Sequence, residues 1–113
     1  MHGITCTYPV KEATEVRLYL LTEPPASIDD WQPGMMWPSE LLDEDGAGYS
    51  IVLCRHTYAN GHSHPIVWHT KETTDDGKRW DVTGKPPNIT VNPSINVIGI
   101  WHGWIRNGAL SNA

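Results

Sequence analysis

Residues 49–70 read YSIVLCRHTYANGHSHPIVWHT, and this stretch decides the fold class of the chain. Its two apolar runs, residues 49–57 and 65–70, are too short for typical helices and are rich in β-branched and aromatic side chains. Asn60-Gly61 lies between the runs, and this dipeptide is a strong signal for the turn of a β-hairpin. The stretch therefore predicts two antiparallel strands joined by a tight turn.

The length of that turn decides which side chains meet across the hairpin. A two-residue turn at Asn60-Gly61 places His56 opposite Pro65. A three-residue turn instead places His56 opposite His64 and puts Gly61 in the left-handed conformation. One residue of slip exchanges the two faces of a strand. We favour the two-residue turn, because it leaves one continuous apolar face for a core.

The rest of the chain predicts a small all-β domain. Nine prolines and ten glycines divide the sequence into short apolar runs, and no long window carries the stripe of an amphipathic helix. We expect further strands at residues 15–21, 80–83, 88–92 and 95–106, and a long loop containing Pro and Trp residues over 26–48. The expected fold class is mainly β, with a single domain over residues 1–113 whose antiparallel sheet forms a small sandwich or roll.

Tryptophan carries much of the apolar volume, since the chain has six Trp residues and no Phe. Trp68, Trp80 and Trp101 lie in expected strands beside Val or Ile and are predicted to be core residues. Trp31 and Trp37 lie in the expected long loop, and we take them as candidates for contact with a ligand or partner.

Charge and hydropathy restrict the classes of partner. The net charge of -5, with basic residues spread along the chain, disfavours binding to nucleic acid. No stretch reaches the roughly 18 apolar residues of a membrane-spanning helix, and the N-terminus lacks the regions of a signal peptide. We therefore expect no nucleic-acid or membrane partner, and a protein that stays where it is made. Cys6 and Cys54 are then expected to be free thiols, with a disulfide as the alternative for an exported chain.

A group of histidines in the second half raises the question of a metal site. Five of the six histidines follow residue 55, and imidazole and thiolate are the ligands that zinc prefers. The candidate ligands are Cys54, His56, His69, His62 and His64. In the two-residue register the first three share one face of the hairpin and the last two lie on the other. We therefore expect no cofactor and keep a small zinc-binding domain as the alternative.

The residues 101–106 predict a second candidate site. Side chains alternate along a strand, so His102, Trp104 and Arg106 point one way while Trp101 and Ile105 point the other. An imidazole, an indole and a guanidinium on one face favour binding of a small ligand or a protein partner by stacking and hydrogen bonding. Such a triple either faces solvent, contacts a partner or pairs with the acidic loop residues 75 and 76.

Catalysis is the third alternative. Ser94, His102 and Asp81 have the residue types of a serine-hydrolase triad, but no Gly-x-Ser-x-Gly elbow surrounds Ser94. Because Ser94 follows Pro93, we interpret it as a turn residue. No catalytic residue is assigned, and a hydrolase-like enzyme centred on His102 is left as an alternative to a binding protein.

Three motifs in the C-terminal half carry a family resemblance. Trp80-x-x-x-Gly84, Pro93-Ser94-Ile95 and His102-Gly103-Trp104, the last followed by Asn107-Gly108, resemble small uncharacterised proteins of tailed bacteriophages and prophages. Some related members carry paired cysteines that look like a zinc ribbon, which this chain lacks. The resemblance implies a phage origin.

From that origin we expect an accessory protein that works by binding. Its partner would be a host protein such as a defence factor, a virion component or a small-molecule ligand. It would act in the cytoplasm of the infected bacterial host or on the virion.

Overall fold

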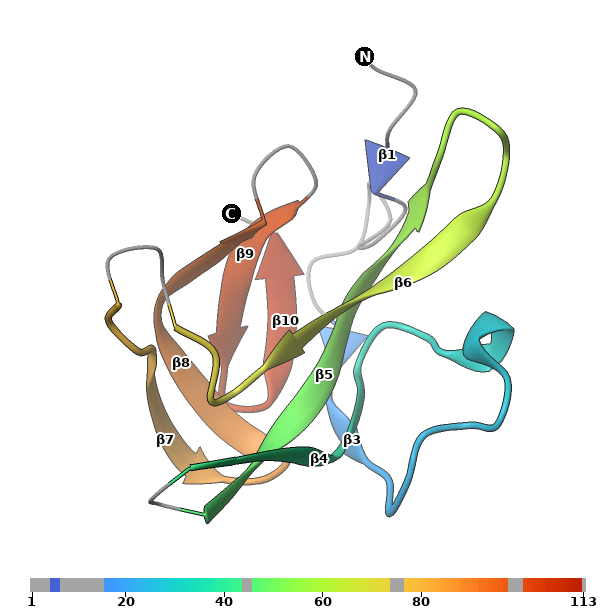
Figure 1. Ribbon diagram of the computed structural model, residues 1–113. Helices are drawn as coiled ribbons and strands as arrows, with labels where there is room; N and C mark the ends of the chain where they lie inside the picture. The colour runs from blue at the N-terminus through green and yellow to red at the C-terminus, as the bar shows by residue number, and fades with distance from the viewer. Residues whose placement is uncertain (1–4, 7–15, 44–45, 74–76, 98–100, 113) are drawn as a thin grey trace.

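Two β-sheets pack face to face in the computed structural model, which describes residues 5–6, 16–43, 46–73, 77–97 and 101–112 (Figure 1). The elements are β1 (Thr5–Cys6), β2 (Val16–Arg17), β3 (Tyr19–Leu20), η1 (Ile28–Asp30, a 3-10 turn), β4 (Met35–Asp43), β5 (Gly46–Thr57), β6 (Ser63–His69), β7 (Asp81–Lys85), β8 (Asn88–Val97), β9 (Trp101–Arg106) and β10 (Ala109–Asn112). The mainly β fold class is confirmed, and the sandwich arrangement agrees with the prediction. The described residues contain no helix long and apolar enough to span a membrane.

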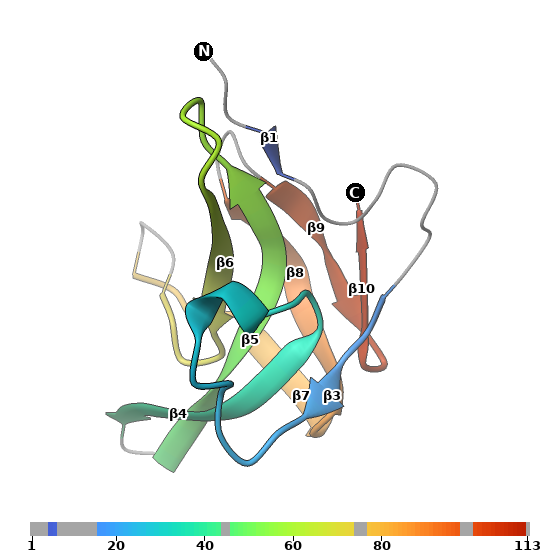
Figure 2. The same cartoon turned by 90° about the vertical axis from the view of Figure 1, so that its right-hand side faces the viewer.

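The first sheet is built around β5, its longest strand. It has the order β1-β5-β4-β3, and β6 also pairs with β5. All of its pairs are antiparallel except β3 with β4. The second sheet has the order β2-β10-β9-β8-β7 and is antiparallel throughout. In Figure 2 the first sheet faces the viewer and the second sheet lies mostly behind it, while η1 contacts β6.

The β5–β6 hairpin has the three-residue turn, so the favoured two-residue register is wrong. His56 lies opposite His64, and Gly61 has a φ of 87°. The predicted register was uniform along the whole hairpin, but the pairing shifts between Val52 and Cys54. A bulge of this kind places consecutive side chains on one side of a strand. It lets β5 keep its apolar face and also turns His56, which is 1% exposed, into the interior.

Two expected segments divide differently from the prediction. The strand expected over 15–21 is split, because β2 joins the second sheet and β3 joins the first. Leu18 between them is buried, and its N–H donates to the carbonyl of Gly108. The single strand expected over 95–106 is the end of β8 and all of β9, which pair antiparallel. Residues 98–100 lie outside the described part of the chain.

The loop expected over 26–48 is shorter than predicted. Residues from Met35 onward form β4, and the register of β4 on β5 shifts after Pro38. Since proline cannot donate to a sheet, it is tolerated where the regular pairing ends. Trp37 on β4 is buried, and its ring lies edge-on to Trp31 at a centroid distance of 4.8 Å.

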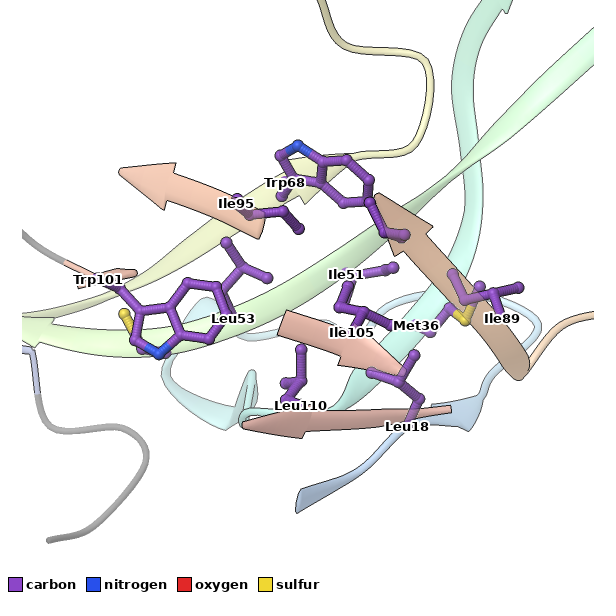
Figure 3. Close-up of a cluster of buried hydrophobic side chains, with 12 residues drawn as sticks. Leu18, Met36, Ile51, Leu53, Trp68, Ile89, Ile95, Trp101, Ile105 and Leu110 are labelled. Carbon is purple, nitrogen blue, oxygen red and sulfur yellow. The ribbon is translucent and has the colours of Figure 1, made fainter. Parts of the chain in front are cut away.

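The core lies between the two sheets and draws on both (Figure 3). Ile51 and Leu53 come from the first sheet, and Ile95, Ile105 and Leu110 from the second. All five are fully or almost fully buried, and they interdigitate as the inner faces of a sandwich do.

The prediction of core tryptophans is confirmed for two of the three residues. Trp68 is 3% exposed and Trp101 is 5% exposed. Trp80 is only half-buried, and its ring lies edge-on to that of Trp68 at 5.5 Å. Trp80 therefore covers the edge of the core.

The Trp101→Ala variant should lose about 3–5 kcal/mol of unfolding free energy, because a large buried ring is replaced by a cavity. Urea denaturation followed by circular dichroism measures this loss. Tyr19→Ala is the matched control, since Tyr19 is 42% exposed, and we expect it to cost less than about 1 kcal/mol. Equal losses in the two variants would contradict the assignment of Trp101 to the core.

Candidate functional site

Ser94 lies on β8 at a break in the pairing between β8 and β9. Val91 is opposite Ile105 and Ile95 is opposite Gly103, so three residues of β8 face one residue of β9 between these pairs. Such a bulge re-aims the side chains of the longer strand. The carbonyl of Ser94 also accepts a hydrogen bond of 3.3 Å from Nε1 of Trp80. The backbone at Ser94 is therefore fixed from the β7 side while its hydroxyl lies on the β9 side.

His102 on β9 meets this hydroxyl. The distance between Ser94 Oγ and His102 Nε2 is 2.9 Å, which is a hydrogen bond. Trp101, Gly103 and Ile105 are buried and His102 is exposed, as the alternation along β9 requires. When the imidazole carries its proton on Nδ1, Nε2 accepts from the serine, and this is the arrangement that a general base needs.

Gly103, next to His102, allows β9 to lie close to β10 and to the Trp101 ring. A Cβ at this position would overlap the carbonyl oxygen of Ser111 on β10 and the ring of Trp101. Only glycine fits this space without displacing backbone or a buried ring. The residue next to His102 is thus constrained by packing as tightly as the core is.

A cleft of about 400 Å³ opens beside Ser94. Its lining combines aromatic, aliphatic and polar residues, which are Trp68, Glu72, Thr73, Trp80, Pro93, Ser94, Ile95, Asn96 and Val97. Asn96 is also the cross-strand partner of His102. Ser94 therefore lies between the imidazole of His102 and the cleft.

A second serine–histidine pair, Ser50 and His69, differs from Ser94 and His102 in its access to solvent. Ser50 Oγ and His69 Nδ1 are 3.0 Å apart in the first sheet. Ser50 is only 4% exposed, so a substrate has no access to its hydroxyl. Accessibility and the adjacent cleft single out Ser94 and His102.

Asp81 does not complete the triad that can be drawn from the sequence. Asp81 lies on β7 and pairs with Asn92 on β8, and β8 lies between β7 and β9. Asp81 and His102 are therefore separated by two strand spacings, about 9.5 Å. Within the described ranges no carboxylate is hydrogen-bonded to His102.

The interpretation of Ser94 as a turn residue is wrong. Ser94 lies inside β8, and its contact with His102 crosses to the neighbouring strand. The contact was not predicted because one continuous strand was expected over residues 95–106, whereas Ser94 and His102 lie on two paired strands.

The five candidate zinc ligands do not gather in the structure. Cys54 is disulfide-bonded, and Cys6 is the only other cysteine in the sequence. The expectation of a free thiol at Cys54 is therefore wrong. His56 is buried with no hydrogen-bond partner on either ring nitrogen, and its ring lies edge-on to Tyr58.

The remaining candidates have other contacts or face solvent. His69 bonds to Ser50, while His62 and His64 are exposed. In the part of the chain that is described, no three His, Cys, Asp or Glu residues are placed to hold a metal ion. The expectation that the protein needs no cofactor stays a prediction.

The triple on β9 keeps the shared face predicted for it. The Cζ atom of Arg106 lies 4.2 Å from the centroid of the Trp104 ring. The acidic residues 75 and 76, considered as partners for it, lie outside the described residues. In the other candidate pair, Trp31 donates through Nε1 to the carbonyl of Pro25, and Trp37 is buried. Binding by these five residues stays a prediction.

Residues 25–113 match the protein-family model described as Bacterial ubiquitination-like system serine protease (BubE). No curated protein and no solved structure gives a significant match. The family match overturns the resemblance to phage proteins, whose motifs lie inside the matched range. The phage accessory role is therefore wrong, and so is the zinc-binding domain. The match gives no support to a host or virion partner or to a phage location.

The same change, glycine to alanine, at two positions tests the close packing of Gly103. Gly103→Ala should lose about 3 kcal/mol or more of unfolding free energy, because its Cβ meets backbone and a buried ring. Gly61→Ala should lose about 1–2 kcal/mol, because its Cβ meets nothing within 4 Å and only the positive φ opposes it. Urea denaturation of the two variants measures the difference. A Gly103→Ala loss no larger than that of Gly61→Ala would refute the close approach at β9.

Proposed function

The chain belongs to the family of bacterial ubiquitination-like system serine proteases (BubE), and we propose that it cleaves an amide bond in a protein of such a system with Ser94 and His102. The observation that carries the assignment is the 2.9 Å hydrogen bond between Ser94 Oγ and His102 Nε2. Ser94 is the nucleophile and His102 is the general base in this proposal. Both lie within the range that matches the family.

The first half of the reaction forms an acyl-enzyme. The oxygen of Ser94 attacks the carbonyl carbon of the substrate while its proton passes to Nε2 of His102. The tetrahedral intermediate then collapses, its bond to the leaving nitrogen breaks, and that nitrogen takes the proton from His102. The substrate acyl group is left as an ester on Ser94.

Water completes the cycle. His102 accepts a proton from a water molecule whose oxygen attacks the ester carbon. The acid product leaves, the proton returns to Oγ, and Ser94 is restored. His102 thus acts as the base in both halves of the reaction, first for the hydroxyl of Ser94 and then for water.

The surroundings of the pair fit a protein substrate. His102 is exposed and Ser94 is half-buried at the mouth of the cleft, so an extended segment of another protein can reach both. The half-buried ring of Trp80 offers an apolar surface for its side chains. The hydrogen bond from Trp80 to the Ser94 carbonyl holds the nucleophile in place as the substrate binds.

Hydrolysis of p-nitrophenyl acetate tests the two roles without knowledge of the natural substrate. The wild type should release p-nitrophenol with an initial burst, and Ser94→Ala should abolish the burst. His102→Ala should slow acylation by about 100- to 10,000-fold, because the base is removed while the nucleophile stays.

Ser50→Ala is the matched control, since Ser50 also bonds to a histidine but is buried. It should keep the burst of the wild type at a temperature where the variant is folded. A burst that survives in Ser94→Ala would exclude Ser94 as the nucleophile.

A further inference from the structure

Arg106 is a cation held in position by an aromatic ring, and no acidic group among the described residues pairs with it. Its guanidinium lies over the ring of Trp104, with Cζ 4.2 Å from the ring centroid. Arg106 is exposed, and among the described residues no hydrogen bond or ion pair engages its N–H groups. Stacking covers one face of a guanidinium but leaves its N–H edges free, since these lie in the plane of the group.

Arg55 shows the contrasting use of the same side chain. Its guanidinium donates to the Ser63 hydroxyl and carbonyl and to the carbonyls of Ile28 and Trp31. Those bonds tie η1 and the segment after it to the β5–β6 hairpin, and they use the donors that a ligand would need. Arg55 is therefore structural, whereas Arg106 keeps its donors available.

The position of Arg106 relates it to the proposed catalytic pair. His102, Trp104 and Arg106 follow one another on the outer face of β9 at intervals of about 6.6–7 Å. Trp104 is the residue of β9 that faces the bulge containing Ser94. A substrate segment that lies along β9 with its carbonyl at Ser94 therefore passes over Trp104 and reaches Arg106 within about four residues.

We propose that Trp104 and Arg106 form a subsite for an acidic side chain of the protein substrate, within about four residues of the bond that Ser94 cleaves. This inference rests on the proposed function. A guanidinium in a fixed plane binds a carboxylate through two parallel hydrogen bonds, which gives both attraction and orientation. Trp104 lowers the entropic cost of holding the arginine in place before the substrate arrives.

The charge of the whole chain makes such a local site selective. With a net charge of -5 the protein does not attract acidic segments at long range. Recognition of a carboxylate must then come from a cation close to it, and Arg106 offers one beside the proposed nucleophile. A neutral segment gains nothing from this contact, so the subsite favours acidic substrates.

A fluorescein-labelled hexaglutamate peptide tests the subsite by fluorescence polarisation. Arg106→Gln should weaken its binding about tenfold, which corresponds to about 1.4 kcal/mol, and Arg106→Lys should fall between that variant and the wild type. Lys85→Gln is the control, because it removes an equal charge from an exposed position on β7 of the same sheet; its binding should stay within about twofold of the wild type. Unlabelled hexaglutamate should also inhibit p-nitrophenyl acetate hydrolysis by the wild type and inhibit Arg106→Gln far less.

The outcomes separate the subsite from the catalytic proposal. Binding that depends on Arg106, with hydrolysis that does not depend on Ser94, supports the carboxylate site and overturns the proposed function. Hydrolysis that depends on Ser94, with hexaglutamate binding equal in the wild type and Arg106→Gln, overturns the subsite alone. Equal weakening in Arg106→Gln and Lys85→Gln also overturns it, since general charge then accounts for the binding.

Discussion

The packing of Ile95 and Ile105 against Ile51 and Leu53 is the interaction on which the rest of the structure depends. These side chains bring β8 and β9 of one sheet against β5 of the other. Because side chains alternate along a strand, turning the two isoleucines inward turns His102 outward. The core contact between the sheets thus fixes which face of the second sheet carries polar chemistry.

Alternation alone does not bring a serine to a histidine, and two local features complete the arrangement. The bulge in β8 puts three residues opposite one residue of β9, so Ser94 reaches toward its neighbouring strand. Gly103 lets β9 lie against β10 and the Trp101 ring without a side chain in between. Both features weaken a regular sheet, and proteins often place such irregularities where function requires a side chain to be aimed.

Local patterns predicted much of this fold from the sequence, and long-range pairing supplied the rest. The position of the turn at Asn60-Gly61, though not its length, and the shared face of His102, Trp104 and Arg106 follow from turn chemistry and period-two alternation. The contact of Ser94 with His102 depends on the register between β8 and β9, which periodicity does not encode. The sequence offered one signal of this register, the glycine at position 99. Dividing the strand expected over 95–106 at this glycine gives two shorter strands that can pair with each other. Likewise the bulge in β5 changes which side chains face inward without any mark in the local sequence.

The central claim is that Ser94 is a nucleophile activated by His102. Labelling the folded protein with a fluorophosphonate and mapping the adduct by tandem mass spectrometry tests this claim most directly, since the probe bonds to activated serines. The account predicts an adduct on Ser94 that is lost in His102→Ala, while the buried Ser50 stays unmodified. An adduct on another serine, or equal labelling of Ser94 with and without His102, would contradict it.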